Sequence, residues 1–255
     1  MPTYVVSDLH GAADELKKAV PEGSTLLLLG DLLNFLDYTD MSGILADVFG
    51  PDDVKKVADL RAQGRVTDAR NMMRERSAGR EDEIRSDIGR RVLEQYDTIF
   101  SALPDPTYLI LGNVDNPMVA QNFVENTPAA RHVDGEILTI AGERFGFIGG
   151  ALPSPLHVAG EITEEEMAAK VENLDECDVL CSHIPPAVPE LCFDTLAQYR
   201  ERGSTDLLRY IEDVQPRRAY FGHVHQPLVS AMYIGRTLCI NVGYFRATRR
   251  AFPHD

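Results

Sequence analysis

The chain has 255 residues, of which 44% are hydrophobic and 25% are charged, a composition typical of a globular protein with a sizeable buried core. Its net charge of -15 argues against long nucleic acids as partners, because binding a phosphate backbone requires clustered lysine and arginine. No apolar stretch approaches the ~20 residues that span a bilayer, and the first strand-like run begins at Thr3, so we expect a cytoplasmic protein without a signal peptide or membrane association.

The sequence opens with a strand–helix–strand pattern. Apolar runs at residues 4–7 and 25–29 predict buried strands, and residues 12–20 between them predict a helix, so the two strands are expected to be parallel. A capping box predicts a later helix at 163–173. Short turns between the last strands indicate antiparallel pairs. Further strands are predicted at 108–111, 137–140, 145–149, 179–181, 219–222, 228–233 and 237–242.

The segment from residue 32 to residue 111 is far longer than a simple crossover requires. Apolar side chains at helical spacing predict an amphipathic helix at 81–102, and further helical segments are predicted at 40–49 and 52–76. Gly50-Pro51 and Gly79 are the expected breaks. We therefore interpret residues 1–255 as a single domain with a helical insertion at about 40–102.

The role of this insertion has two interpretations. As a cap over a functional site, it could offer Arg61, Arg65 or Arg70 to a phosphate group. Alternatively, its alternating charges mark exposed helix faces, and the helices pack on the body or form a homodimer. The second interpretation is favoured, because charge alternation is the usual pattern of a solvated helix.

The four cysteines are Cys177, Cys181, Cys192 and Cys239. Cys181 and Cys239 lie within apolar strand-like runs, and the spacing of Cys177 and Cys181 is not that of a zinc finger. We therefore predict free structural thiols in a reducing compartment.

Five short polar clusters each follow an apolar run. Open α/β sheets build their sites at the carboxyl ends of strands, so these clusters are expected to meet. Carboxylate, carboxamide and imidazole groups are ligands for divalent metal ions. The pattern therefore predicts a two-metal centre. The clusters are Asp8-Leu9-His10, Gly30-Asp31, Gly112-Asn113-Val114-Asp115, Ser182-His183 and Gly222-His223-Val224-His225.

In this order, the clusters resemble the motifs of the calcineurin-like metallophosphoesterases, from residue 3 to about residue 243. The resemblance implies an α/β fold in which two mixed β-sheets form a sandwich flanked by helices. It also implies two divalent ions, chosen from Mn, Fe, Zn, Ni or Mg with Mn favoured, that share the Asp31 carboxylate. Asp8, His10 and His225 would supply the other ligands of one ion, and Asn113, His183 and His223 those of the second.

The same resemblance implies hydrolysis of a small phosphorylated substrate by a hydroxide that bridges the two ions. Asp31, Asn113 and His183 would act directly in catalysis, and Asp115 would orient the site. Val114 departs from the family pattern, because many members carry a histidine there that protonates the leaving group or orients substrate. General acid catalysis contributes ~10²–10⁴-fold, so we expect a phosphodiester or another phosphate whose leaving group needs little protonation.

Alternative functions remain open. A phosphomonoesterase acting on proteins or nucleotides would need additional positive side chains, and Arg246, Arg249 and Arg250 either reach the site or form a solvated tail. A non-catalytic scaffold is the other alternative, although a scaffold has no chemical reason to keep all seven ligands. Three histidines match no motif and are expected at the surface or in loops: His132, His157 and His254.

Overall fold

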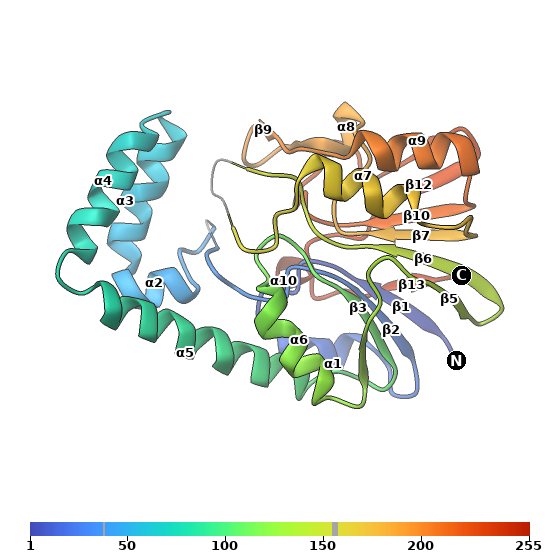
Figure 1. Ribbon diagram of the computed structural model, residues 1–255, viewed down its shortest axis with the longest axis horizontal. Coiled ribbons are helices and arrows are strands. Elements are labelled where there is room, and N and C mark those ends of the chain that lie inside the picture. Colours follow the sequence, from blue (N-terminus) through green and yellow to red (C-terminus); the bar gives the residue numbers. More distant parts are fainter. Residues whose placement is uncertain (38, 155–157) are drawn as a thin grey trace. The chain divides into compact units, whose positions relative to one another are not determined.

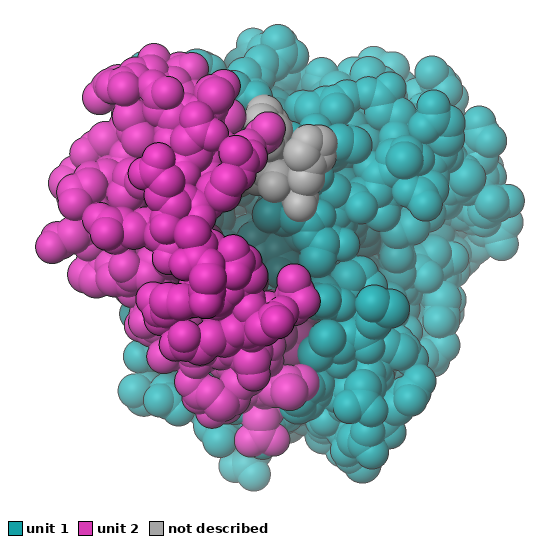
Figure 2. Space-filling view, turned by 60° about the vertical axis from the view of Figure 1, so that its left-hand side comes forward, with its two compact units in different colours: residues 1–32, 98–255 teal, residues 33–97 magenta. Residues whose placement is uncertain are grey.

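The computed structural model describes residues 1–37, 39–154 and 158–255, and Figure 1 shows its helices and strands. The chain divides into two compact units, which Figure 2 colours separately. The first unit comprises residues 1–32 and 98–255, and the second comprises residues 33–97. All seven predicted metal ligands therefore belong to the first unit.

One mixed sheet of the first unit has the strand order β13-β1-β2-β3-β4. Its strands β1 and β2 are parallel, as the strand–helix–strand pattern predicts, and α1 (Ala13–Ala19) lies between them in the chain. The edge strand β13 runs antiparallel to β1, with His254 opposite Thr3. The strands are β1 (Thr3–Val6), β2 (Thr25–Leu29), β3 (Thr107–Ile110), β4 (Ala130–His132) and β13 (Phe252–His254).

The second mixed sheet has the order β11-β12-β10-β7-β6-β5. Its four central strands are parallel, and both edge strands are antiparallel to their neighbours, which confirms the antiparallel pairs expected from the short turns. The strands are β5 (Ile137–Ile140), β6 (Glu143–Ile148), β7 (Val179–Ser182), β10 (Arg218–Phe221), β11 (Ala231–Ile234) and β12 (Thr237–Asn241).

The two sheets pack face to face and confirm the predicted sandwich (Figure 1). Their shared core joins Val5 and Leu27 of one sheet to Phe145 and Cys181 of the other. Each large apolar side chain that folding buries fully contributes about 1.5–3 kcal/mol. Because side chains alternate along a strand, Leu180 points to the opposite face, where α7 (Glu164–Glu172) and α9 (Thr205–Val214) pack.

Helix ends follow local hydrogen bonding. The capping box predicted at the start of α7 is confirmed, because both of its reciprocal hydrogen bonds form between Thr163 and Glu166. The Ser204 hydroxyl accepts hydrogen bonds from two backbone N–H groups and begins α9, a helix that the sequence analysis did not predict. Three further helices were also not predicted: α6 (Pro117–Glu125), α8 (Pro189–Cys192) and α10 (Phe245–Thr248).

The second unit is helical. Its helices are α2 (Ile44–Phe49), α3 (Pro51–Ala62), α4 (Val66–Ser77) and the greater part of α5 (Glu81–Phe100). The single helical segment predicted at 52–76 is wrong, because Gly64 takes a left-handed φ of 73° and separates α3 from α4. Among the described residues, no helix combines the length and apolar character that crossing a membrane requires.

The C-terminal segment has regular structure and is not a loose tail, although Arg249 and Arg250 are exposed as the tail interpretation expects. It forms α10 and then β13, and Arg249 makes an ion pair with Glu15 at 2.9 Å. The expectation for two histidines is also wrong, because His132 and His254 lie on strands, and the His254 side chain is only 7% exposed. His157 lies outside the described residues. All four cysteines are free and buried, as predicted.

Candidate metal centre

The seven candidate ligands all follow the carboxyl ends of strands. Asp8 and His10 come after β1, and Asp31 comes after β2. Asn113 follows β3, His183 follows β7, and the remaining two histidines follow β10. The five strands belong to both sheets, so the sandwich brings these residues to one edge.

The backbone is strained at four of these residues. Asp8, His10, Asp31 and His223 have φ values of 55°, 41°, 53° and 67°, in the left-handed region that favours glycine. A non-glycine residue held there costs about 1–3 kcal/mol. The surrounding packing offsets this cost. Glycine, the usual residue in this conformation, has no side chain, whereas here each position carries a carboxylate or an imidazole of the site.

Two motif glycines permit close packing around the carboxylates. A Cβ atom on Gly112 would lie 2.2 Å from Oδ1 of Asp31, and one on Gly222 would lie 2.3 Å from Oδ2 of Asp8. Real Cβ atoms do not approach other heavy atoms so closely. Any side chain at either position would therefore displace a candidate metal ligand.

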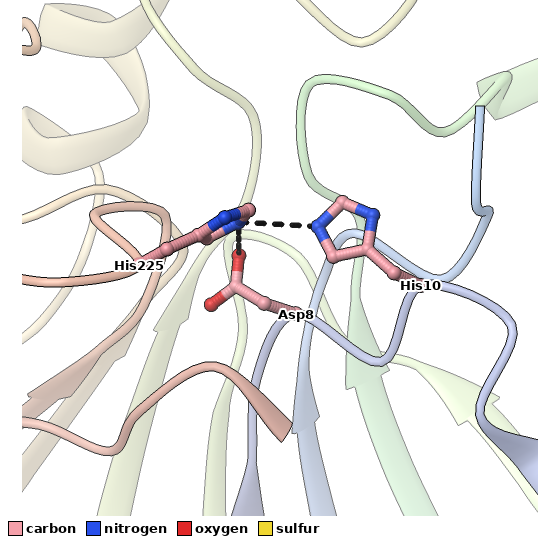
Figure 3. Close-up of side chains that lie close together, drawn as sticks. All are labelled: Asp8, His10 and His225. Atoms are coloured by element: carbon pink, nitrogen blue, oxygen red, sulfur yellow. Dashed lines mark hydrogen bonds and ion pairs between the residues drawn. The ribbon is translucent and has the colours of Figure 1, made fainter. Parts of the chain in front are cut away.

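One group of ligand atoms comes from Asp8, His10 and His225, whose side chains point toward one another in Figure 3. Nε2 of His225 lies 3.2 Å from Nε2 of His10 and 3.6 Å from Oδ1 of Asp8. Nε2 of His10 also lies 3.7 Å from Oδ2 of Asp31. Three nitrogen and oxygen donors thus converge, with the Asp31 carboxylate beside them.

A second group comprises Asp31, His183 and His223, together with the Asn113 carboxamide. Oδ1 of Asn113 lies 3.1 Å from Nε2 of His183 and 3.0 Å from Nδ1 of His223. Oδ1 of Asp31 lies 3.5 Å from the same His183 nitrogen. Asp31 therefore directs one carboxylate oxygen toward each group.

Hydrogen bonds outside the two groups fix the ligands. Nδ1 of His183 lies 2.8 Å from the Leu29 carbonyl, which leaves Nε2 facing the site. The buried Asp115 carboxylate accepts hydrogen bonds from Leu32 N and Gly112 N, both at 2.9 Å, and so ties the loop after β2 to the loop after β3. Burial and the neighbouring Asp31 raise the pKa of Asp115 to about 7, and cations bound nearby would oppose that shift.

The protonation of the ligands suits metal binding. Burial and the neighbouring His183 lower the pKa of His223 to about 4, so this imidazole is neutral and free to donate a lone pair. Although burial opposes ionisation, hydrogen bonding and charge from His225 hold the pKa of Asp8 well below its usual range. Burial opposes the change, but the Asp8 carboxylate raises the pKa of His225, so a metal ion bound there would displace a proton from that ring. Carboxylate oxygens and imidazole nitrogens without a thiolate fit Mn, Fe, Zn, Ni or Mg.

The structure adds residues that the motifs did not predict. The Tyr244 ring stacks on His225 with centroids 4.0 Å apart and planes 7° apart, and it meets the edge of His10 at 5.4 Å. The Arg246 guanidinium donates a hydrogen bond to the His10 carbonyl at 3.0 Å, so it supports the backbone of a ligand. Arg246 was a candidate in the sequence because of its charge, and it contacts the backbone of a ligand rather than the ligand atoms. Tyr244 has no diagnostic spacing relative to the motifs, so the sequence offered no signal for it.

Comparisons with known proteins agree with this geometry. The family described as calcineurin-like phosphoesterase matches residues 1–227. One crystal structure aligns with 96% of this chain and 92% of its own, with a TM-score of 0.57 and 18% identity. The crystal structure of TT1561 of Thermus thermophilus aligns over 100% of this chain and 98% of its own, with a TM-score of 0.51 and 13% identity. These two likenesses show the shared fold. No curated protein matches the sequence significantly.

Proposed function

Because the chain belongs to the calcineurin-like phosphoesterase family, whose members are metal-dependent phosphoric ester hydrolases, we propose that it is a dinuclear phosphodiesterase acting on a small substrate. The observation that carries the dinuclear part is the position of Asp31. Its two oxygens face two separate groups of ligands, at 3.7 Å from His10 and 3.5 Å from His183. A carboxylate in this place can bridge two cations and reduce their mutual repulsion.

The carboxylate and carboxamide ligands give the two groups different charges. Two divalent ions, when bound, polarise a phosphoryl oxygen and supply a nucleophile at neutral pH. Both groups share the Asp31 carboxylate, but Asp8 adds a second negative charge to the first group, whereas Asn113 adds only a neutral oxygen donor to the second. The second group therefore keeps more net positive charge for a phosphate. We propose manganese as the favoured metal.

Two features support a phosphodiester over a phosphomonoester. Val114 occupies the family position of the histidine, and its side chain cannot transfer a proton to a leaving group. Arg246, the nearest candidate for binding a dianionic monoester, commits its Nη1 donor to the His10 carbonyl. A diester carries one negative charge and therefore demands less positive charge from the protein.

The experiment compares matched chromogenic substrates, bis(4-nitrophenyl) phosphate and 4-nitrophenyl phosphate, with added Mn²⁺ and with chelator. We expect Mn²⁺-dependent turnover with a higher kcat/KM for the diester, abolished in Asp31→Ala. The control is Asp14→Ala, which removes an exposed carboxylate on α1 and should leave turnover unchanged.

Other outcomes would redirect the proposal. A higher kcat/KM for the monoester would favour a phosphatase. Turnover that survives chelation or the Asp31→Ala substitution would contradict the metal-dependent mechanism. Two bound ions without hydrolysis of either substrate would favour the non-catalytic scaffold.

A further inference from the structure

The ring nitrogens of His223 face in two directions. Nδ1 lies 3.0 Å from Asn113 Oδ1, among the ligand atoms of the second group. Nε2, on the other side of the ring, lies 3.9 Å from Oε2 of Glu201. A histidine that ligates a metal commonly donates its remaining N–H to a carboxylate or a carbonyl, which fixes the tautomer and the ring orientation. His183 already has such a partner in the Leu29 carbonyl.

Glu201 is carried by a hairpin that is bonded to the ligand loop. Strands β8 (Phe193–Asp194) and β9 (Tyr199–Arg200) form this hairpin, and Glu201 N donates to the Cys192 carbonyl at 2.9 Å. The buried Asp194 carboxylate accepts a hydrogen bond from Gln226 N at 3.0 Å. Thr195 N donates to the Gln226 carbonyl at 2.8 Å. The hairpin thus holds the residue that directly follows His225.

A carboxylate partner would also strengthen His223 as a ligand without occupying a position on the ion. Among the described residues, the first group has its own carboxylate in Asp8, whereas the second has the carboxylate of Asp31 that faces both groups. A carboxylate beside the outer nitrogen makes an imidazole a better donor to a metal ion. Glu201 is half-buried and lies outside the five motifs, so the sequence pattern did not identify it.

We propose that Glu201 is a positioning residue for the second metal site, accepting a hydrogen bond from the Nε2–H of His223 and keeping Nδ1 toward the ion. The inference rests on the proposed function, because it assumes that the second group binds a metal. An N–H···O hydrogen bond is about 2.7–3.2 Å long, so Glu201 needs to approach His223 by only about 1 Å.

The test is titration of the metal-free protein with Co²⁺, followed by the visible absorption of the bound ion and by competition with a chelator. In Glu201→Ala we expect one of two dissociation constants to rise by about 10–100-fold, with the other unchanged. Glu201→Gln should lose less Co²⁺ affinity, because its amide oxygen can still accept a hydrogen bond from the Nε2–H of His223. The control is Glu190→Gln, which removes an exposed charge on α8 and should bind as wild type does.

The possible results distinguish a wrong role for Glu201 from a wrong dinuclear site. Two ions bound equally well by wild type and Glu201→Ala would overturn the role of Glu201 alone. Equal weakening of both ions in Glu201→Ala, with a lower Tm of the metal-free protein, would also overturn it. Wild-type protein that binds fewer than two ions would contradict the dinuclear proposal and the inference with it.

Discussion

Val114 lies next to the carboxylate that faces both groups of ligands. Its backbone N–H donates to Oδ1 of Asp31 at 3.0 Å, and the residue is half-buried. Replacing it with histidine adds a group that can protonate a leaving oxygen. In Val114→His we expect kcat on alkyl phosphate esters to rise relative to 4-nitrophenyl esters, within the ~10²–10⁴-fold range of general acid catalysis. Val114→Leu is the control and should show no such change; an equal response to both leaving groups in Val114→His would contradict the argument.

Gly112 tests how tightly the site is packed. In Gly112→Ala the new Cβ would lie 2.2 Å from Oδ1 of Asp31, so the carboxylate must move. We expect weaker Mn²⁺ binding and a free energy of unfolding reduced by about 1–3 kcal/mol, the usual cost of overpacking. Titration calorimetry and urea unfolding measure the two effects.

The matched control is Gly89→Ala, in the middle of α5, where nothing lies within 4 Å of the added Cβ. This variant should bind Mn²⁺ normally and gain about 0.5–1 kcal/mol of stability from helix propensity. Unchanged Mn²⁺ binding in Gly112→Ala would show that Asp31 does not depend on the glycine.

For single residues, their order in the chain and their type predicted which ones lie together at the edge of the sandwich. Asp8, Asn113 and His223 lie far apart in the sequence but each follows a strand, and the strands' carboxyl ends share one edge. The left-handed backbone at Asp8 and His223 was not predictable, because aspartate and histidine adopt it more often than most residues but still only in a small minority of cases. Tyr244 and Glu201 were missed because each acts by contacting a histidine from a different part of the chain.

At the scale of elements, the Glu143 carboxylate links the edge strand β13 to the second sheet. His254 on β13 lies 3.1 Å from the Glu143 carboxylate of β6, and Arg217 also pairs with Glu143. The hydrogen bond from Arg217 is the main reason that the pKa of Glu143 falls from 4.5 to about 2. The stabilisation is therefore complete above about pH 4.5 and is lost as the pH falls towards 2.

We expect Glu143→Gln to lower the free energy of unfolding by an amount that depends on pH. Because the pair is partly exposed, we expect the variant to be destabilised at pH 7 by no more than about 1 kcal/mol. The difference from wild type should shrink between pH 4.5 and pH 2, as the wild-type carboxylate becomes protonated. Urea unfolding across this range measures it, with the exposed Glu22→Gln as control. A difference that does not change with pH would rule out the ionic contribution.

Most strands that were predicted are apolar runs buried between layers, such as β2 and β7, where composition alone indicates burial. The edge strands β5 and β11 were predicted as well, because short turns join them to their neighbours. The strand β13 contains Pro253 and a histidine, and its pairing with β1 depends on contacts between the two ends of the chain. The break between α3 and α4 depends on a single residue, Gly64, and a glycine can also occur inside a helix, as Gly89 does. Local sequence therefore predicts buried strands and strands next to short turns better than it predicts β13 or the helix break.

At the scale of the whole molecule, the net charge of -15 predicts weak binding to long nucleic acids. Non-specific binding to a phosphate backbone depends on cations that displace counterions, and proteins with such surfaces bind at about 10⁻⁴–10⁻⁶ M. We expect a Kd weaker than about 10⁻⁴ M for a single strand of about 40 nucleotides at physiological salt, measured by fluorescence anisotropy. Micromolar binding that weakens steeply with added salt would contradict this expectation.

The division of the chain into two units does not test the role expected for the helical insertion. The sequence predicted a helical insertion at about 40–102, and the second unit comprises residues 33–97. Its helices carry exposed ion pairs between neighbouring turns, such as Arg90 with Glu94 and Lys55 with Asp59. Exposed pairs of this kind contribute little to stability, so they do not explain why the segment is present. A homodimer formed through the insertion stays a prediction.

The proposed function depends on two metal ions that share Asp31. The most direct measurement is the number of Mn²⁺ ions bound per folded chain, by titration calorimetry and elemental analysis, for wild type and Asp31→Ala. We expect two ions in wild type, and weaker binding of both in Asp31→Ala, because each group loses the oxygen that faces it. A folded wild-type protein that binds one ion or none, or an Asp31→Ala variant that binds both as wild type does, would rule out a two-metal centre that shares Asp31.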